Sequence, residues 1–147
     1  MNGPDPYELE RFVTAQDDGN TYANALAELQ AGAKRSHWMW FVFPQIAGLG
    51  SSLTARHYAI GSLDEARAYL AHPVLGPRLR AAARALADRA GSDDPQTILG
   101  SVDALKLRSS MTLFARAAPE EPVFADVLAR YYGAAADPAT EVRLRDG

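Results

Sequence analysis

The sequence contains no cysteine, which excludes a disulfide framework, a thiolate nucleophile and zinc sites with cysteine ligands. Histidine is scarce as well. There are three, and no two have the spacing of metal ligands on a helix, so we expect no metal site. The chain also lacks a basic excess, because its formal net charge is −3, and this argues against binding to a nucleic acid polymer.

Long apolar runs are missing too. The longest, residues 38–43, is far shorter than the ~20 residues that span a bilayer, so we expect no membrane partner. The first residues contain no basic segment followed by an apolar one, as a secretory signal would, and we therefore expect a cytoplasmic protein. No P-loop or dinucleotide-binding fingerprint occurs, and the sequence predicts no cofactor.

Lysine is rare in this chain. Of the 15 basic residues only Lys34 and Lys106 are lysine, and all the others are arginine. A chain with such a preference for arginine retains lysine most readily where a compact point charge is needed. Both lysines lie in the two segments that also carry the densest groups of polar and aromatic side chains.

The length of 147 residues is typical of one domain, and a hydrophobic content of 48% is ordinary for a globular protein. We predict a single domain over residues 1–147, with its core over about 5–133 and a C-terminal tail over 134–147. Many alanines and apolar side chains at helical spacing predict an all-α or mainly α bundle of about six to seven helices. The run 38–43 is ambiguous between a buried strand and a buried helix, because all its positions are apolar.

Capping residues indicate where the helices begin and end. Asp5 before a proline predicts the start of the first helix, Ser62 with Glu65 forms a capping box, and Gly32 and Gly133 are natural helix ends. The predicted helices cover about residues 6–16, 20–31, 62–71, 76–90, 102–117 and 122–132, with a short helical turn near 95–99.

Residues 32–52 form the first segment with candidate functional side chains. A lysine ammonium suits a phosphate or carboxylate, a histidine can act as general acid or base, and an indole can stack on a ring. The alternative is that the aromatic side chains are core and the imidazole is buried. The glycines and serines after residue 47 resemble a phosphate cradle, although a simple glycine turn explains them equally well. The candidates are Lys34, Ser36, His37, Trp38, Trp40, Gln45 and Ser52.

Residues 103–114 form the second segment. Asp103, Lys106 and Ser109 are three positions apart, so on a helix they share one stripe. Together with Thr112 they predict the polar wall of a pocket. The alternative is an exposed ion pair between Asp103 and Lys106, worth well under ~1 kcal/mol.

These segments also resemble a known family. The pattern G-x-K-x-S-H-W-M-W-x-x-F-P-Q over residues 32–45, followed by G-L-G-x-S at 48–52, is similar to the domain-of-unknown-function family 1810. The patterns D-x-x-K-x-x-S-S-M-T-L-F at 103–114 and D-x-x-T at 137–140 match as well, so the resemblance covers essentially the whole chain. It implies a small, mainly α-helical protein of bacterial type and no particular reaction. Some members carry the label calpastatin, but a rigid tryptophan-rich domain is unlike the disordered segments of calpain inhibitors.

The residue types favour a pocket for an anionic small molecule such as a nucleotide or an ADP-ribose-like compound. A hydrolase or group-transfer enzyme would use His37 or Asp103 as its proton carrier. The alternative is a non-catalytic binding or interaction module whose aromatic motif is chiefly structural core. The pocket hypothesis requires that the two segments meet in the folded chain. Its ligand-binding residues would be Lys34, Ser36, Trp38, Trp40, Gln45, Ser52, Lys106, Ser109 and Thr112.

Overall fold

The computed structural model describes residues 4–146, which form ten α-helices and one 3₁₀ helix. Within that range there is no strand, and one isolated backbone bridge pairs Ile46 with Ile60. The expected all-α fold class is therefore confirmed. The elements are α1 (Glu10–Asp17), η1 (Asp18–Asn20), α2 (Thr21–Ala31), α3 (Met39–Val42), α4 (Leu53–His57), α5 (Leu63–Ala71), α6 (Leu75–Asp88), α7 (Pro95–Leu99), α8 (Ser101–Ala117), α9 (Pro122–Tyr132) and α10 (Pro138–Asp146).

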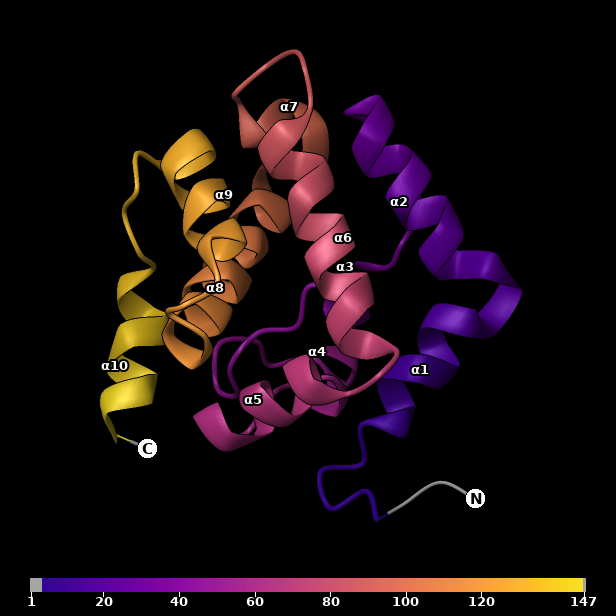
Figure 1. Cartoon of the computed structure of the whole chain (residues 1–147), viewed down its shortest axis with the longest axis vertical. Helices are drawn as coiled ribbons and strands as arrows, with labels where there is room; N and C mark the ends of the chain where they lie inside the picture. The colour runs from indigo at the N-terminus through magenta and orange to yellow at the C-terminus, as the bar shows by residue number, and fades with distance from the viewer. Residues whose placement is uncertain (1–3, 147) are drawn as a thin grey trace.

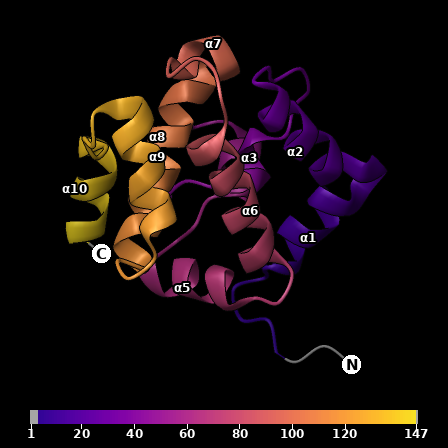
Figure 2. The ribbon, with the colours of Figure 1, turned by 45° about the horizontal axis from the view of Figure 1, so that its top comes forward.

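Helix α6 lies between two groups of helices (Figure 1). It packs against α2 and α5, and also against α9, which in turn lies beside α8. Helix α10 packs on the outer side of α8, and Figure 2 shows α1 and α2 at the opposite side of the molecule. Among the residues that the structure describes, no helix is both long and apolar enough to cross a membrane.

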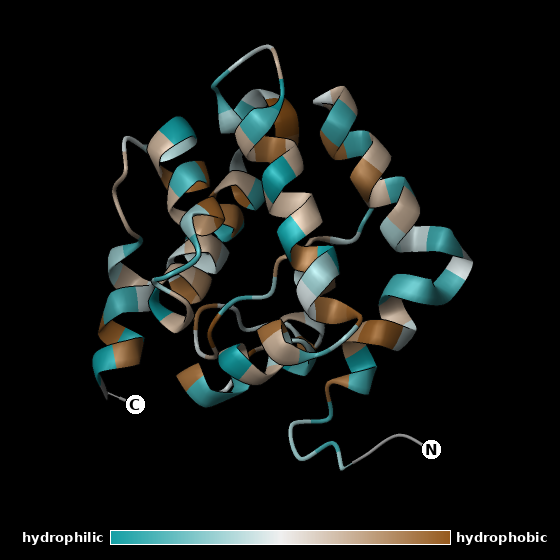
Figure 3. Cartoon of the chain, in the orientation of Figure 1, coloured by the Kyte–Doolittle hydropathy of each residue, from teal (hydrophilic) through white to brown (hydrophobic). Residues whose placement is uncertain are grey.

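One hydrophobic core connects these helices. Apolar and polar positions alternate along α6 and α9 (Figure 3), as expected for helices that bury one face. Among the described residues, the six largest fully buried side chains are aromatic, and each removes a large apolar area from water. They are Phe12, Trp38, Phe43, Tyr69, Phe114 and Phe124.

The predicted caps at Ser62 and Gly32 are confirmed, but the first helix begins later than predicted. The hydroxyl of Ser62 accepts a hydrogen bond from the backbone N–H of Glu65, and Gly32 ends α2 with a left-handed φ of 74°. Asp5 accepts from the N–H groups of residues 9 and 10, but α1 begins only at residue 10. The reason is Glu8, whose φ of 54° lies outside the right-handed helical region and interrupts the first turn.

The structure decides one segment that the sequence left open and corrects another. The ambiguous run 38–43 contains the short helix α3 and is not a strand. The segment after residue 133, expected to be a tail outside the core, contains α10. Thr140 on this helix is fully buried, and Leu144 packs against the core. The weak amphipathicity of α10 explains why periodicity did not reveal it, because polar anchors rather than an apolar face attach it to α8.

Candidate functional site

Asp103, on the first turn of α8, binds both lysines of the chain. The Nζ atom of Lys34 lies 2.9 Å from its Oδ2 atom, and that of Lys106 lies 3.8 Å from its Oδ1 atom. The three side chains are 18%, 10% and 23% exposed respectively, so the cluster is mostly withdrawn from solvent. The two segments selected from the sequence therefore meet in the folded chain.

Each lysine also lies near the face of one tryptophan ring. Lys34 Nζ is 5.0 Å from the ring centroid of Trp38, and Lys106 Nζ is 4.7 Å from that of Trp40, both within cation–π range. The two indoles differ in access, because Trp38 is 0% exposed whereas Trp40 is partly exposed. This corrects the expectation that Trp38 stacks on a ligand, since a ring with no exposed surface belongs to the core.

Glu28, near the C-terminal end of α2, holds the start of the first segment in place. Its carboxylate accepts hydrogen bonds from the backbone N–H groups of Arg35 and Ser36, from the Ser36 hydroxyl and from the Trp38 indole N–H, at 2.6 to 3.0 Å. Partial burial opposes ionisation, but these donors outweigh it and lower the pKa of Glu28 from 4.5 to about 2. Ser36 thus has a structural partner already.

Sequence reasoning missed Glu28, although one signal was available. An acidic side chain near a helix C-terminus is unfavourable with respect to the helix dipole. Glu28 occupies such a position on α2, which indicates that its carboxylate serves something outside its own helix.

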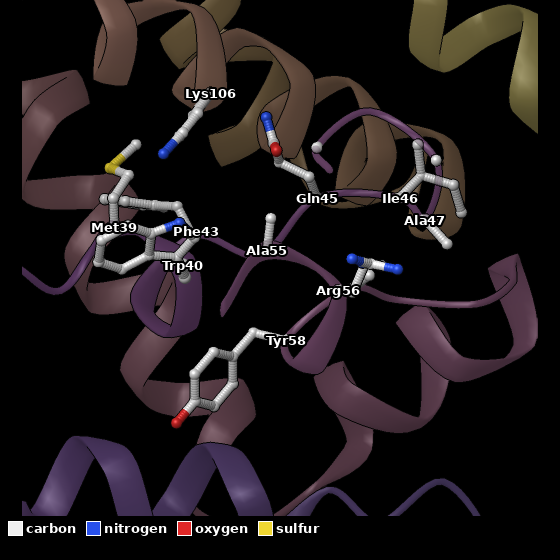
Figure 4. A pocket seen from close by; sticks show the side chains of 13 residues that line it. Met39, Trp40, Phe43, Gln45, Ile46, Ala47, Ala55, Arg56, Tyr58 and Lys106 are labelled. Carbon is white, nitrogen blue, oxygen red and sulfur yellow. The ribbon is translucent and has the colours of Figure 1, made fainter. Parts of the chain in front are cut away.

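A small pocket opens beside Lys106, between α3 and the segment that follows it. We call it the Lys106 pocket; its volume is about 90 Å³. Figure 4 shows Lys106 reaching from α8 toward the Trp40 ring, while the Tyr58 hydroxyl points away from the other labelled side chains. Its lining residues are Met39, Trp40, Phe43, Gln45, Ile46, Ala47, Gly48, Gly50, Ala55, Arg56, Tyr58, Ala59 and Lys106.

Residues 47–59 form a loop that closes one side of this pocket. Its ends are joined by two backbone hydrogen bonds of 2.8 Å, from Ala47 N–H to Ile60 O and from Ile60 N–H to Gln45 O. Ends that lie this close, with a compact segment between them, are typical of an Ω-loop. The loop contains α4, whose first turn is capped by the exposed Ser52, so the hydroxyl of this candidate serves the helix.

Helix α10 contacts the same loop through Arg143, which donates a hydrogen bond to the carbonyl of Gly48 at 3.2 Å. A Cβ atom on Gly48 would lie 2.7 Å from the guanidinium carbon of Arg143. The backbone of Gly48 has a φ of 97°, in the left-handed region. The left-handed backbone therefore favours glycine at this position, whereas the exposed end of the Arg143 side chain could shift to relieve the contact.

Ser109 and Thr112 attach α10 and do not line the pocket. The Ser109 hydroxyl donates to Asp137 Oδ2 at 3.2 Å, and the Thr112 hydroxyl accepts from the Asp137 N–H at 2.9 Å. The same carboxylate accepts from the hydroxyl of Thr140 at 2.6 Å. The D-x-x-T pattern at 137–140 and the hydroxyls of α8 thus act as one helix-docking contact.

The two candidate proton carriers lie outside the pocket lining. His37 is exposed, and its ring forms no hydrogen bond with another residue in the range 4–146. Asp103 is occupied by both lysines. The only titratable side chains in the lining are Arg56, Tyr58 and Lys106, and no histidine or carboxylate belongs to it. Sequence reasoning missed Arg56 and Tyr58, because nothing distinguishes them by type from other arginines and tyrosines of the chain.

Comparisons with known proteins agree with this architecture. The chain is similar to a crystal structure of the conserved hypothetical protein Rv1873 from Mycobacterium tuberculosis, with 50% identity and a TM-score of 0.91. The similarity covers 96% of this chain and 99% of that one. A search of curated proteins finds no match. The family described as "Protein of unknown function (DUF1810)" matches residues 6–144, nearly the whole sequence, and the chain therefore belongs to this family.

Proposed function

We propose that the protein binds a small anionic molecule in the Lys106 pocket. The observation that carries this proposal is the unsatisfied donor capacity of Lys106. Its Nζ atom is 3.8 Å from Asp103, which is longer than the 2.7–2.9 Å of a charge-assisted hydrogen bond, and the side chain lines the pocket. An ammonium group has three donors, so capacity remains for an anion.

Two further pocket residues support the same conclusion. Arg56 forms no ion pair with any acid of the described chain, and the Gln45 side-chain amide forms no hydrogen bond there. Among residues 4–146, the pocket therefore combines two cations and one amide with no acidic group in its lining. This composition favours an anionic ligand over a neutral or cationic one.

Binding is better supported than catalysis. General acid–base chemistry needs a group that exchanges a proton within hydrogen-bond reach of the ligand. The lining contains no histidine or carboxylate, and His37 and Asp103 are not part of it. A hydrolase or group-transfer reaction that relies on these two residues would need the ligand to extend well outside the pocket.

The volume of about 90 Å³ limits what the pocket can enclose. Sites that bury drug-sized ligands span about 300–1,000 Å³. A nucleotide or an ADP-ribose-like compound would therefore insert one terminal group at most, and the rest would lie over the surface.

The test uses the protein's two tryptophans as internal reporters. Inorganic phosphate, acetate, benzoate, AMP, NAD and ADP-ribose are titrated while thermal unfolding and tryptophan fluorescence are followed. A ligand at 100 times its Kd stabilises the folded state by about 2.7 kcal/mol, and one in the pocket also perturbs the emission of Trp40. Trp40→Phe removes that signal and leaves the buried Trp38 as the only emitter.

The matched variants are Lys106→Met and Arg145→Met. Arg145 is an exposed cation on α10 that forms no ion pair within the described chain, so its replacement controls for the loss of one positive charge. We expect stabilisation by the ligand to disappear in Lys106→Met and to persist in Arg145→Met. Stabilisation that persists equally in both variants would contradict the proposal.

A further inference from the structure

The Lys106 pocket has two chemically different parts. Its inner wall is apolar, because Met39, Phe43 and Ile46 are at most 4% exposed and show only carbon and sulfur to the cavity at their side-chain ends. Its polar groups are side-chain ends that reach it from other elements. Figure 4 shows Lys106 and the Gln45 amide on one side of Ala55 and Arg56 on the other. A ligand that satisfies both parts has one charged head and an apolar body.

At the Lys106 end of the pocket the charge balance favours a head with a single negative charge, because Arg56 lies at the other side of the cavity. Two lysines share the one carboxylate of Asp103, which leaves one positive charge uncompensated within the cluster. A dianion in a mostly apolar cavity would need further donors to replace its hydration, because unpaired buried charge is costly. A carboxylate needs fewer hydrogen-bond donors to replace its hydration. It can accept from Lys106 through one oxygen and from the Gln45 amide through the other.

The size of the cavity limits the body. The volume of about 90 Å³ is far below the about 300–1,000 Å³ of sites that enclose drug-sized ligands, so the apolar body of the ligand is small. A short aliphatic chain or a single benzoate ring meets this limit. The partly exposed Trp40 ring is the flat surface against which such a body would pack.

We infer that the ligand of the Lys106 pocket is a short or aromatic monocarboxylate, whose head is held by Lys106 and Gln45 and whose body lies against the partly exposed Trp40 ring, above a buried apolar floor that includes Met39 and Phe43. This inference rests on the proposed function and makes it specific. Arg56 lies at the other side of the cavity and faces a head group only if the ligand is reversed.

The experiment compares matched pairs of compounds by isothermal titration calorimetry with the full chain. Benzoate and benzamide have the same shape but differ in charge, and phenyl phosphate has the same ring with a larger, more highly charged head. Hexanoate and dodecanoate differ only in length. We expect benzoate to bind at least about tenfold more tightly than benzamide, because only its head makes charge-assisted hydrogen bonds. We expect a similar preference over phenyl phosphate, because a dianionic head loses more hydration in the pocket. We expect hexanoate to bind at least about tenfold more tightly than dodecanoate, whose body exceeds the cavity.

Variants separate the contribution of the head from that of the body. In Lys106→Met the preference for benzoate over benzamide should vanish while benzamide keeps its affinity, because the apolar wall is intact. Gln45→Leu should lower the affinity for benzoate more than the affinity for benzamide. Arg145→Met, the control, should retain the wild-type preference.

The outcomes distinguish this inference from the proposal on which it rests. Binding of phenyl phosphate or ADP-ribose that depends on Lys106, without binding of benzoate or hexanoate, would overturn the carboxylate assignment and leave anion binding in place. Equal affinities for benzoate and benzamide would also overturn it. If none of these compounds binds in a manner that depends on Lys106, both the inference and the proposed function fail.

Discussion

Lys34 and Lys106 bind the same carboxylate but lie in very different surroundings. Lys34 is 10% exposed, contacts Asp103 at 2.9 Å and also donates to the carbonyl of Ser36 at 2.6 Å. Lys106 is 23% exposed, is 3.8 Å from Asp103 and lines a pocket. The difference teaches that one shared acid can hold two cations unequally: Asp103 fixes Lys34 within the fold and leaves Lys106 with spare donor capacity at the pocket.

The segments around the two lysines differ in the same way. Arg35, Ser36 and Trp38 are tied to Glu28 by four hydrogen bonds, so the polar groups that make these bonds are already satisfied. Around Lys106, the side chains of Gln45 and Arg56 have no such partner within the described chain. Satisfied groups stabilise a structure, whereas unsatisfied donors at a cavity are available to a ligand.

We expect the largest loss of stability from Asp103→Ala, which removes the carboxylate that both lysines contact. Loss of one partner from a buried ion pair costs about 3–5 kcal/mol, and because this cluster is partly exposed we expect about 3 kcal/mol. Urea unfolding followed by circular dichroism measures the change. Asp126→Ala is the control, since its pair with Arg84 is 50% and 44% exposed and should cost at most about 0.5 kcal/mol. Equal losses in the two variants would show that Asp103 is an ordinary surface acid.

A direct comparison of Lys34→Met with Lys106→Met comes next in size. We expect Lys34→Met to lower the free energy of unfolding by about 2 kcal/mol, because it leaves the partly buried Ser36 carbonyl and Asp103 without their closest donor. Lys106→Met should cost at most about 0.5 kcal/mol, because its 3.8 Å pair with Asp103 is long and Lys34 still neutralises that carboxylate. The stabilisation that an added ligand provides should follow the opposite order: Lys106→Met should lose more of it than Lys34→Met. If the two variants lose equal stability, the two lysines do not have distinct roles.

Part of this distinction was accessible from the sequence. The scarcity of lysine, the helix caps and the apolar periodicity predicted the all-α class, most helices and the two segments that meet at Asp103. Whether Lys34 or Lys106 faces the pocket was not predictable, because that depends on the 47–59 loop, whose closure at Ile46 and Ile60 joins residues without any local pattern. The roles of Ser109 and Thr112 depend in the same way on Asp137, a residue 28 positions after Ser109.

A smaller effect is expected from Glu28→Gln, together with a change in pH dependence. The pKa of Glu28 is lowered from 4.5 to about 2 in the folded chain, so its contribution to stability is present above pH 4.5 and is lost as the pH falls toward 2. We expect the variant to lose about 1–2 kcal/mol at pH 7, because weaker acceptor contacts remain. The difference between wild type and variant should shrink progressively between pH 4.5 and pH 3, as measured by urea unfolding at each pH. A difference that stays constant over this range would exclude the ionised carboxylate as its source.

The smallest effect concerns the tryptophans that accompany the two lysines. Trp38→Phe leaves Trp40 as the only emitter, and Trp40→Phe leaves Trp38. Because Trp38 is fully buried and Trp40 is partly exposed, acrylamide should quench Trp40 several-fold more efficiently. The carboxylate ligand proposed above should protect Trp40 from the quencher and leave Trp38 unaffected. Protection of Trp38 instead would move the ligand to the Lys34 side of Asp103 and would reverse the roles of the two lysines.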